Sequence, residues 1–536
     1  MWGINENQKR KLRLTRVQIF KLGYLVSSPI TNPPVNQPPL VFLLGFDIGS
    51  SSIKVALVNA GDGVVVGTAQ YPDTEMAIAS PRPDWAEQNP EDWWEAASIA
   101  TRKLLAKTLV SPDQIASIGI AYQMHGLVVV DQVGKVLRPA IIWCDSRAVD
   151  IGNQALATLG KGFCLEHYLN APGNFTASKL RWVRENEPQV FASIHKAMLP
   201  GDYIAYRMTG EICTTVTGLS EGIFWDFKQN EVAHRLLEYY EIPPSMLPEI
   251  APVFAQQGKL SSTAAAVLGL VEGIPIGYRA GDQPNNALSL NVLRPGEVAA
   301  TGGTSGVVYA VTERPVFDPQ QRVNSFAHVN YLPEDPRAGV LLCINGAGSM
   351  YRWVRGNFAG GEMGYPEMES LASSVPIGSE GLSILPFGNG VERMLGQQNR
   401  GAQVFGLQFN RHGQQHFFRA ALEGIAFAFV CGMEAMREVG IPISSMRVGN
   451  DNLFQSAIFS QTIATLMGVE IEMLEATGAV GAAKAAGVSV GVYANIEEAM
   501  GQNLMPQVVY SPSLENQRAY MEAYLRWQGQ VKDLVG

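Results

Sequence analysis

Two similar short segments, placed about half a chain apart, constrain the fold more than any other feature. The first spans residues 47–53 and reads DIGSSSI, and the second spans 301–307 and reads TGGTSGV. Each carries apolar residues on both sides of a turn rich in glycine and hydroxyl groups, a pattern typical of two strands joined by a hairpin. Two equivalent hairpins facing each other across a cleft would hold the phosphates of a nucleotide, because such turns offer backbone N–H groups to anions. Chance similarity between two short hairpins is the alternative.

A single carboxylate, Asp282, precedes the second of these segments, in the run GDQPNNA at 281–287. Pro284 suits the first turn of a helix, which puts Asp282 or Gln283 near the helix N-cap. Arg279 is the only basic residue near Asp282 in sequence, and the two could pair. A base beside a phosphate-binding turn is the minimum equipment of a kinase. The alternative is an aspartate that caps a helix ahead of an ordinary hairpin.

Length and composition narrow the class of protein. A chain of 536 residues is too long for one ordinary core, so two large domains are expected. The net charge of −9 argues against nucleic acid as a partner, and no apolar run approaches the length of a membrane span. The 5 cysteines are scattered and form no CxxC motif, which fits a reducing compartment. We therefore expect a cytoplasmic protein with a small-molecule substrate, and a homodimer is one option for its assembly.

Residues 1–40 differ from the rest of the chain. The stretch 9–16 is basic, and 30–40 is rich in proline and asparagine. We predict a disordered or weakly docked N-terminal extension. A start codon placed too early and an organelle-targeting peptide are the alternatives.

Several local patterns in the first half predict individual elements. Asn89 is a good N-cap and Pro90 a good first residue for a helix that runs to about residue 110. A buried strand at 115–120 ends in QMHG at 123–126, and strand ends are where α/β proteins place ligand contacts. Trp143 is either a wall of a sugar site or a core residue, and a pair between Asp145 and Arg147 is one interpretation of the stretch that follows. The stretch GLSEGIFWD at 218–226 is interpreted as a loop with exposed aromatic residues and no specific chemistry.

The second half of the chain contains fewer patterns that predict individual elements or site residues. A glycine-rich turn at 345–350 leads into a helix at 351–355, and a long helix is predicted at 416–439. His412 and His416 have the spacing of metal ligands, but Gly413 lies between them and no third ligand is near, so a non-metal role is favoured. The helix predicted at 476–488 consists mostly of small residues, which would permit the close approach of a flat ring such as adenine.

From about Phe42 to Tyr510 the chain resembles the FGGY carbohydrate kinases, and within them the xylulokinases. The resemblance rests on several motifs in the same order: FDIGSSSIKV, WAEQNPEDWW, YQMHG, WCDSR, GDQPNNA, ATGGTSG, LPFGNGVER and LEGIAFAF. It implies an α/β fold with two actin-like (ribonuclease H-like, ASKHA) domains flanking a catalytic cleft. The expected limits are 41–292 for the N-terminal domain, 293–512 for the C-terminal domain and 513–536 for a C-terminal helix.

The resemblance also assigns roles to single residues. Asp282 falls on the catalytic base, and Asp47 on a second catalytic acid that holds Mg²⁺ through water. Substrate contacts are expected from Met124, His125, Asp282, Gln283 and Trp143. Nucleotide contacts are expected from Gly49, Ser50, Ser51, Lys54, Gly303, Thr304, Ser305, Gly348, Arg352, Gly449, Asn450 and Asn452. The family's adenine loop usually reads Gly-Gly-Gly-Ala, whereas 449–452 here reads GNDN, so the register of the adenine contacts is open by a couple of residues.

The activity that these assignments imply is phosphorylation of D-xylulose to D-xylulose 5-phosphate, with ATP and Mg²⁺ as cofactors. Such a reaction would feed xylose use and the pentose phosphate pathway. The alternatives are another sugar or polyol kinase of the family, such as a ribulokinase or gluconokinase, and a non-catalytic sugar-sensing pseudokinase. Retention of Asp282 and of both turns argues against the last.

Overall fold

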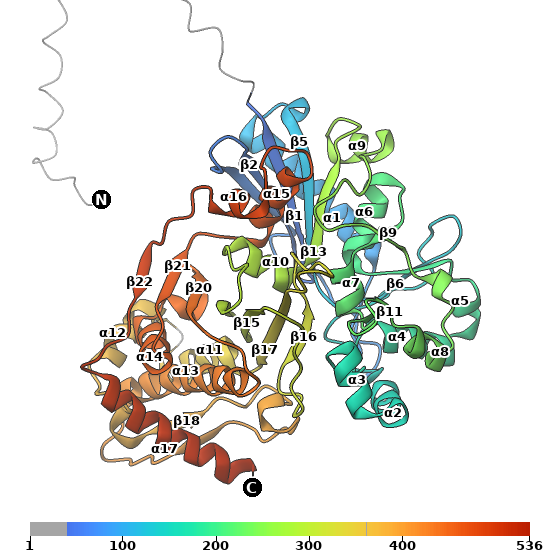
Figure 1. The fold of residues 1–536 in the computed structure, drawn as a ribbon. Helices are drawn as coiled ribbons and strands as arrows, with labels where there is room; N and C mark the ends of the chain where they lie inside the picture. The colour runs from blue at the N-terminus through green and yellow to red at the C-terminus, as the bar shows by residue number, and fades with distance from the viewer. Residues whose placement is uncertain (1–39, 361, 536) are drawn as a thin grey trace, which may run out of the picture. The chain divides into compact units, whose positions relative to one another are not determined.

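Two mixed β-sheets, one from each half of the sequence, organise the fold (Figure 1). The computed structural model describes residues 40–360 and 362–535. The extension predicted at 1–40 therefore lies, apart from Leu40, outside the described residues.

The first sheet has the strand order β13-β5-β1-β2-β3. Strands β1 (Phe42–Ile48), β2 (Ile53–Asn59) and β3 (Val65–Tyr71) are antiparallel, whereas β5 (Ile115–Tyr122) runs parallel to β1, and β13 (Ile276–Gly281) runs parallel to β5. The strand, turn and strand predicted from residue 40 onwards are confirmed. The hairpin register places Asp47 directly opposite Lys54.

The second sheet, with the order β16-β17-β15-β14-β20-β21-β22, repeats this plan. Three antiparallel strands, β14 (Glu297–Gly302), β15 (Gly306–Thr312) and β17 (Ala338–Ile344), are followed by the parallel strands β20 (Ser445–Gly449) and β21 (Ile471–Leu474). Strands β16 (Asn324–Ala327) and β22 (Val508–Tyr510) form the edges. Hairpins β1–β2 and β14–β15 thus occupy equivalent places, as the two similar segments in the sequence predict.

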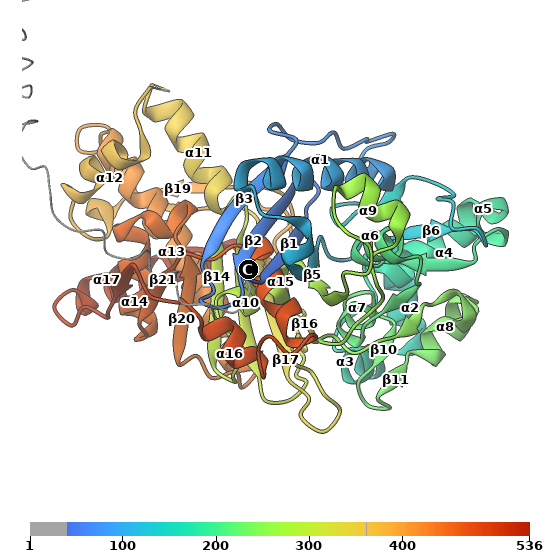
Figure 2. The same ribbon diagram turned by 90° about the horizontal axis from the view of Figure 1, so that it is seen from above.

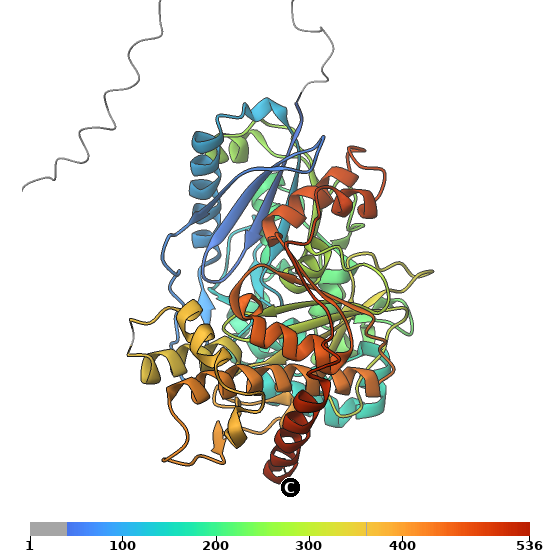
Figure 3. The same cartoon turned by 90° about the vertical axis from the view of Figure 1, so that its left-hand side faces the viewer.

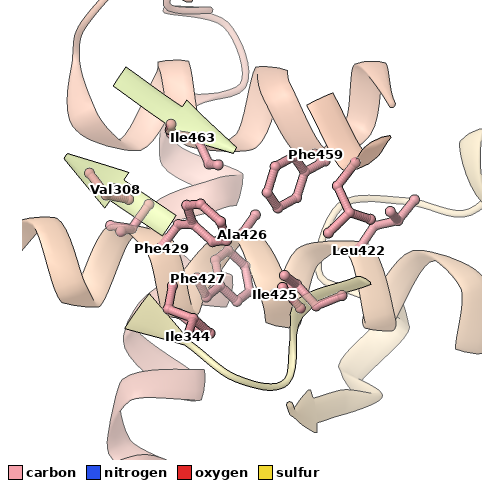
Figure 4. Packing of buried hydrophobic residues seen from close by; sticks show 14 of the residues in the cluster. Val308, Ile344, Leu422, Ile425, Ala426, Phe427, Phe429, Phe459 and Ile463 are labelled. Atoms are coloured by element: carbon pink, nitrogen blue, oxygen red, sulfur yellow. The ribbon is translucent and has the colours of Figure 1, made fainter. Parts of the chain in front are cut away.

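Helices cover both sheets. Helix α1 (Pro90–Thr108) packs on β2 and β3, and Asn89 caps it as predicted, because its side chain accepts the N–H of Glu91. Helix α13 (Gln414–Glu438) packs against α11 (Ala347–Phe358), α12 (Tyr365–Ser373) and α14 (Ala457–Met467). Its apolar side chains meet those of α14 and of the second sheet in one core, which Figure 4 shows around Phe427, Phe429 and Phe459. Among the described residues, α13 is the one helix long and apolar enough to cross a membrane, and most of it is buried in this core.

Two helices cross between the sheets. Helix α10 (Asp282–Ser289) continues from β13 of the first sheet and packs on β14 and β15 of the second. Helix α15 (Gly478–Val488) follows β21 of the second sheet and packs on β1, β2, β5 and β13 of the first, where Figures 1, 2 and 3 show it in red beside the blue strands.

This crossing overturns one prediction from the sequence. A Cβ atom on Gly45 of β1 would lie 1.8 Å from the carbonyl oxygen of Ala479, and one on Gly119 of β5 would lie 1.9 Å from that of Ala482. The small residues of α15 therefore allow the helix backbone to meet the sheet backbone. The prediction that they make room for adenine was wrong.

The region 149–240 is largely helical. It contains α2 (Val149–Leu159), α3 (Lys161–Tyr168), α4 (Thr176–Asn186), α5 (Pro188–Ala192), α6 (Pro200–Thr209), α7 (Val216–Glu221) and α8 (His234–Tyr240). The interpretation of 218–226 as a loop with exposed aromatic residues was wrong, because this stretch begins inside α7 and both Phe224 and Trp225 are buried. Nearby, β6 (Val128–Val130) pairs with β8 (Lys196–Met198).

The remaining elements are short, apart from the last helix. They are β4 (Glu87–Gln88), β7 (Ala140–Ile141), β9 (Cys213–Thr214), β10 (Trp225–Asp226), β11 (Glu231–Val232), β12 (Glu249–Ile250), α9 (Ser262–Leu268), β18 (Ser383–Leu385), β19 (Gln403–Phe405), α16 (Ile496–Gly501) and α17 (Gln517–Val535), with 3₁₀ turns at Pro112–Gln114, Pro244–Met246, Ser379–Gly381, Arg393–Leu395 and Asn452–Gln455. The predicted domain limits at 292 and 512 stay predictions. The first sheet ends before residue 292 and the second begins after it. Helix α15 belongs to the predicted C-terminal domain but packs on the first sheet.

Candidate active site

Asp282 stands at the junction of β13 and α10. The N-cap of α10 is Gly281, so Asp282 is the first helical residue, one position later than a capping role requires. Burial and then the negative charge of Asp47 raise the pKa of Asp282 to about 7. The predicted pairing with Arg279 was wrong, because Arg279 Nε lies 3.1 Å from Asp202 Oδ1 in a buried ion pair. A carboxyl with a near-neutral pKa suits a general base that works near pH 7.

Asp47 lies at the end of β1, close to the starts of both crossing helices. A Cβ atom on Gly478, the first residue of α15, would lie 2.9 Å from Asp47 Oδ2 and 3.4 Å from Asn285 Nδ2. The Asn285 amide of α10 donates to the carbonyl oxygen of Gly478 at 2.9 Å. Burial raises the pKa of Asp47, and Lys54 across the hairpin opposes that shift. The structure thus brings the two predicted acids together from the end of β1 and the start of α10.

His125 follows β5 and has a fixed tautomer. Its Nδ1 lies 2.8 Å from the backbone carbonyl oxygen of Glu221, and a carbonyl can only accept, so Nδ1 carries the proton and Nε2 keeps its lone pair. Burial and the charge of Lys179 lower the pKa of His125 to about 3, so the ring is neutral at physiological pH. The ring centroid lies 4.9 Å from that of Phe175 and 5.3 Å from that of Phe326.

Met124 and Glu221 lie against Gly281, the residue just before Asp282. A Cβ atom on Gly281 would lie 2.6 Å from both Met124 Cγ and Glu221 Oε2. The structure therefore gathers Met124, His125 and Asp282, which the sequence predicts as substrate contacts, around the end of β13. Gln283, the next residue of α10, is partly exposed beside them.

Sequence reasoning missed Glu221. This residue ends α7, is 1% exposed, and neither of its carboxyl oxygens has a hydrogen-bond partner among the described residues. Burial raises its pKa well above the usual range, and the charges of Asp282 and Asp202 add to the shift. The available signal was an acidic residue between Leu219 and the apolar run that starts at Ile223.

Trp143, a predicted substrate contact, lies against the first glycine-hydroxyl turn. It is 51% exposed, so the core alternative is excluded, and its Nε1 donates to Ser50 Oγ at 3.3 Å. Asp145 and Arg147 pair as predicted, with Arg147 Nη2 2.6 Å from Asp145 Oδ2.

The two glycine-hydroxyl turns differ in their surroundings. In the first, Gly49 donates its N–H to the carbonyl oxygen of Ser52 at 3.2 Å, and the side chains of Ser51 and Lys54 are exposed. In the second, Gly303 accepts the N–H of Gly348 at 2.9 Å, and Thr304 accepts that of Ser349 at 3.1 Å. A Cβ atom on Gly348 would lie 2.3 Å from the carbonyl oxygen of Gly303, so helix α11 can approach the turn only with glycine there.

A pocket of about 580 Å³ opens beside the second turn. Its walls are the turn itself, the starts of α11 and α12, and the segment after β20, and five predicted nucleotide residues line it: Gly303, Thr304, Gly348, Arg352 and Asn452. The residues that the prediction missed are Gly302, Tyr351, Tyr365, Pro366, Glu369, Leu453, Gln455 and Ser456. Tyr351 and Tyr365 stack with ring centroids 5.6 Å apart, a contact between two helices that no local pattern indicates.

The other predicted nucleotide residues lie outside the lining of this pocket. They are Gly49, Ser50, Ser51, Lys54, Ser305, Gly449 and Asn450. Asn450 N–H donates to the carbonyl oxygen of Leu474 at 2.9 Å, and its side-chain amide donates to Gln507. In the loop after β20 the pocket residues therefore start at Asn452, a few positions after Gly449.

Comparison with known proteins agrees with this geometry. Residues 42–289 match the N-terminal domain of the FGGY family of carbohydrate kinases, and residues 298–490 match its C-terminal domain. The chain belongs to the FGGY family of carbohydrate kinases. This membership confirms the resemblance seen in the sequence and makes the protein a phosphotransferase acting on a sugar or related alcohol.

Individual relatives are similar over most of the chain. The xylulose kinase of Escherichia coli K12 is 29% identical over 466 residues, which cover 87% of this chain and 92% of that protein. The L-xylulose/3-keto-L-gulonate kinase of the same bacterium is 27% identical over 505 residues, which cover 92% of this chain and 97% of that protein. The crystal structure of xylulose kinase from Rhodospirillum rubrum is 26% identical, has a TM-score of 0.81, and covers 92% of this chain and 99% of that chain. The predicted fold class is confirmed.

Proposed function

We propose that this family member phosphorylates D-xylulose with ATP and releases D-xylulose 5-phosphate and ADP. The observation that carries the proposal is the meeting of Asp282, Met124 and His125 at one place, next to Asp47, which lies just before the first turn. The choice of D-xylulose is supported by the relatives, of which the xylulose kinase of Escherichia coli spans nearly the whole fold.

In the proposed reaction, Asp282 accepts the proton of the terminal sugar hydroxyl as its oxygen attacks the γ-phosphorus. A new P–O bond to the sugar forms, the bond to the leaving ADP breaks, and the proton remains on the Asp282 carboxyl. The Nε2 atom of His125 has a free lone pair, so it can accept a hydrogen bond from another sugar hydroxyl. Met124 supplies an apolar surface beside it.

The residues present fit a magnesium ion. Asp47 and Asp282 are two partly buried acids close enough for the charge of Asp47 to raise the pKa of Asp282, and a nearby cation would offset this repulsion. Mg²⁺ prefers oxygen ligands and usually keeps several waters, so Asp47 would hold it through water. When bound, the ion neutralises negative charge on the β- and γ-phosphates.

The nucleotide would lie in the pocket beside the second turn. Thr304 and Arg352 are exposed toward that space and carry the hydroxyl and the positive charge that phosphate oxygens bind. The first turn, with Ser50, Ser51 and Lys54, would contact the transferred phosphate from the acceptor side. In-line transfer then takes place where the two sheets meet.

A substrate panel tests the proposal. ADP release is measured in a coupled assay with D-xylulose, L-xylulose, ribulose, gluconate and glycerol. We expect the highest kcat/KM with D-xylulose, and we expect Asp282→Asn to lower it by about 10²–10⁴-fold, the usual loss on removal of a general base. A lack of ADP release with every one of these acceptors would favour the non-catalytic pseudokinase alternative instead.

A second candidate is a sister activity on another sugar. The L-xylulose/3-keto-L-gulonate kinase matches a larger share of this chain than the xylulose kinase does, at an identity only slightly lower. A higher kcat/KM for L-xylulose or gluconate in the same panel would select this candidate. A cytoplasmic location and a homodimer complete the proposal, and sedimentation of the purified protein tests the second.

A further inference from the structure

A buried lysine lies directly beneath the loop that carries His125. Lys179 of α4 is 0% exposed, and its Nζ donates to the carbonyl oxygens of His125 and Ile142, both at 2.9 Å. Asp145, the acid whose charge most affects Lys179, is already bound by the guanidinium of Arg147 and by the N–H of Ala86. Lysine is almost never fully buried unless it is paired. The two hydrogen bonds from Lys179 to carbonyl oxygens therefore indicate that its role is to hold these two backbone groups.

The peptide that Lys179 binds has an unusual conformation. His125 has a φ of 61°, in the left-handed region that residues with a side chain seldom adopt. The next residue must be glycine, because a Cβ atom on Gly126 would lie 2.6 Å from Pro200 Cγ. Strained backbone of this kind persists only where its surroundings hold it. Lys179 holds the carbonyl of His125, and the carbonyl of Glu221 holds its imidazole.

The bonds from Lys179 do not require it to be charged. Burial lowers the pKa of Lys179 to about 7, while the charge of Asp145 opposes the shift. An ammonium group has three N–H donors and a neutral amine has two, and two are enough for the two carbonyl oxygens. When charged, Lys179 also disfavours protonation of His125, which keeps the lone pair of Nε2 available.

We propose that Lys179 is a positioning residue of the acceptor site, which fixes His125 so that Nε2 faces a hydroxyl of the sugar. The proposal rests on the proposed function, because it requires that His125 bind the acceptor. Lys179 itself does not touch the substrate. Its effect therefore has to pass through His125, and this is the property that an experiment can isolate.

The test compares Lys179→Met with a matched control, Lys484→Met, in the full-length enzyme. Lys484 of α15 is also buried, at 7% exposure, and its Nζ donates to the carbonyl oxygen of Gln502, away from the acceptor loop. We expect Lys179→Met to raise the KM for the sugar about tenfold or more, equivalent to about 1.4 kcal/mol, and to change the KM for ATP by less than about twofold. The control should leave both KM values unchanged. An equal rise of the sugar KM in both variants would overturn the proposal.

A double-mutant cycle with His125→Ala separates positioning from general damage. If Lys179 acts through His125, adding Lys179→Met to His125→Ala changes the sugar KM by less than about twofold. A further rise of about tenfold in that background would refute a role through His125.

A measurement on the imidazole covers the case in which Lys179→Met does not fold. Lys179→Gln retains N–H donors on a shorter side chain, and ¹⁵N NMR of labelled histidine reports the tautomer and pKa of His125. We expect the Nδ1–H tautomer at pH 6 in the parent protein, and a mixture of tautomers with a higher pKa in Lys179→Gln. An unchanged His125 signal would refute the proposal. This readout needs no sugar, so it remains decisive even if the substrate panel refutes the proposed function.

Discussion

The pH dependence of turnover should follow the ionisation of Asp282. Only the carboxylate form can accept a proton, and its pKa is about 7 because of burial and the charge of Asp47. With that value, about a tenth of the enzyme is active at pH 6 and about nine-tenths at pH 8. We therefore expect kcat/KM for the sugar to rise severalfold, up to about tenfold, between these two pH values, because burial, the larger cause of the shift, remains when Mg²⁺ offsets the charge of Asp47. An aspartate with an ordinary pKa would give no change over the same range.

The assay is initial-rate ADP release at saturating Mg²⁺, in overlapping buffers from pH 5 to pH 9. The nucleotide is a possible confounder, because a terminal phosphate has a second pKa of about 6. Asp47→Asn separates the two sources, since it removes a negative charge that raises the pKa of Asp282. In this variant the acid limb should move to lower pH by on the order of one unit, even though the overall rate falls.

Two results would refute this reasoning. A profile that is flat from pH 6 to pH 8 would mean that Asp282 is ionised throughout and that burial does not raise its pKa. An acid limb that stays in place in Asp47→Asn would belong to the nucleotide or to another group. Either outcome would leave the position of Asp282 in the site without the predicted electrostatic consequence.

Three further changes should each affect one property. Asp282→Asn should raise the melting temperature at pH 8 but not at pH 4. The raised pKa of Asp282 favours the folded state at pH values below the ordinary pKa of 3.8, and this contribution is lost as pH rises through about 7. An equal rise of the melting temperature at both pH values would contradict the pKa shift. His125→Ala should raise the KM for the sugar far more than that for ATP, as steady-state kinetics would show. Gly348→Ala should weaken ADP binding, measured by calorimetry, about tenfold or more, because its Cβ would lie 2.3 Å from the carbonyl oxygen of Gly303. Gly356→Ala on the same helix should bind ADP normally, because a Cβ there meets nothing within 4 Å.

Features set by neighbouring residues could be predicted from the sequence. The hairpins β1–β2 and β14–β15 follow from glycine-hydroxyl turns between apolar runs, and the start of α1 follows from Asn89 and Pro90. Asp282 was recognisable because a proline two residues later marks the start of a helix. In each case the physical cause lies within a few residues of its effect.

Features set by distant residues could not be predicted in this way. The partner of Arg279 is Asp202 on α6, so the nearest acid in sequence, Asp282, was the wrong choice. The burial of Glu221 depends on the packing of α7 against β13 and β16, which come from different halves of the chain. The pocket beside the second turn likewise combines the starts of α11 and α12 with the segment after β20.

The small residues of α15 show how close packing fixes the reacting groups. A small side chain indicates a close approach, but the sequence does not say to what. Here α15 meets α10 as well as the first sheet, since a Cβ atom on Gly481 would lie 1.8 Å from Ser289 Oγ. Helix α10 begins at Asp282 and α15 begins beside Asp47, so contact between these helices sets the spacing of the two acids. Phosphoryl transfer requires reacting atoms about 3 Å apart and in line, and a bulkier residue in α15 would therefore displace the base from the nucleotide without touching either of them.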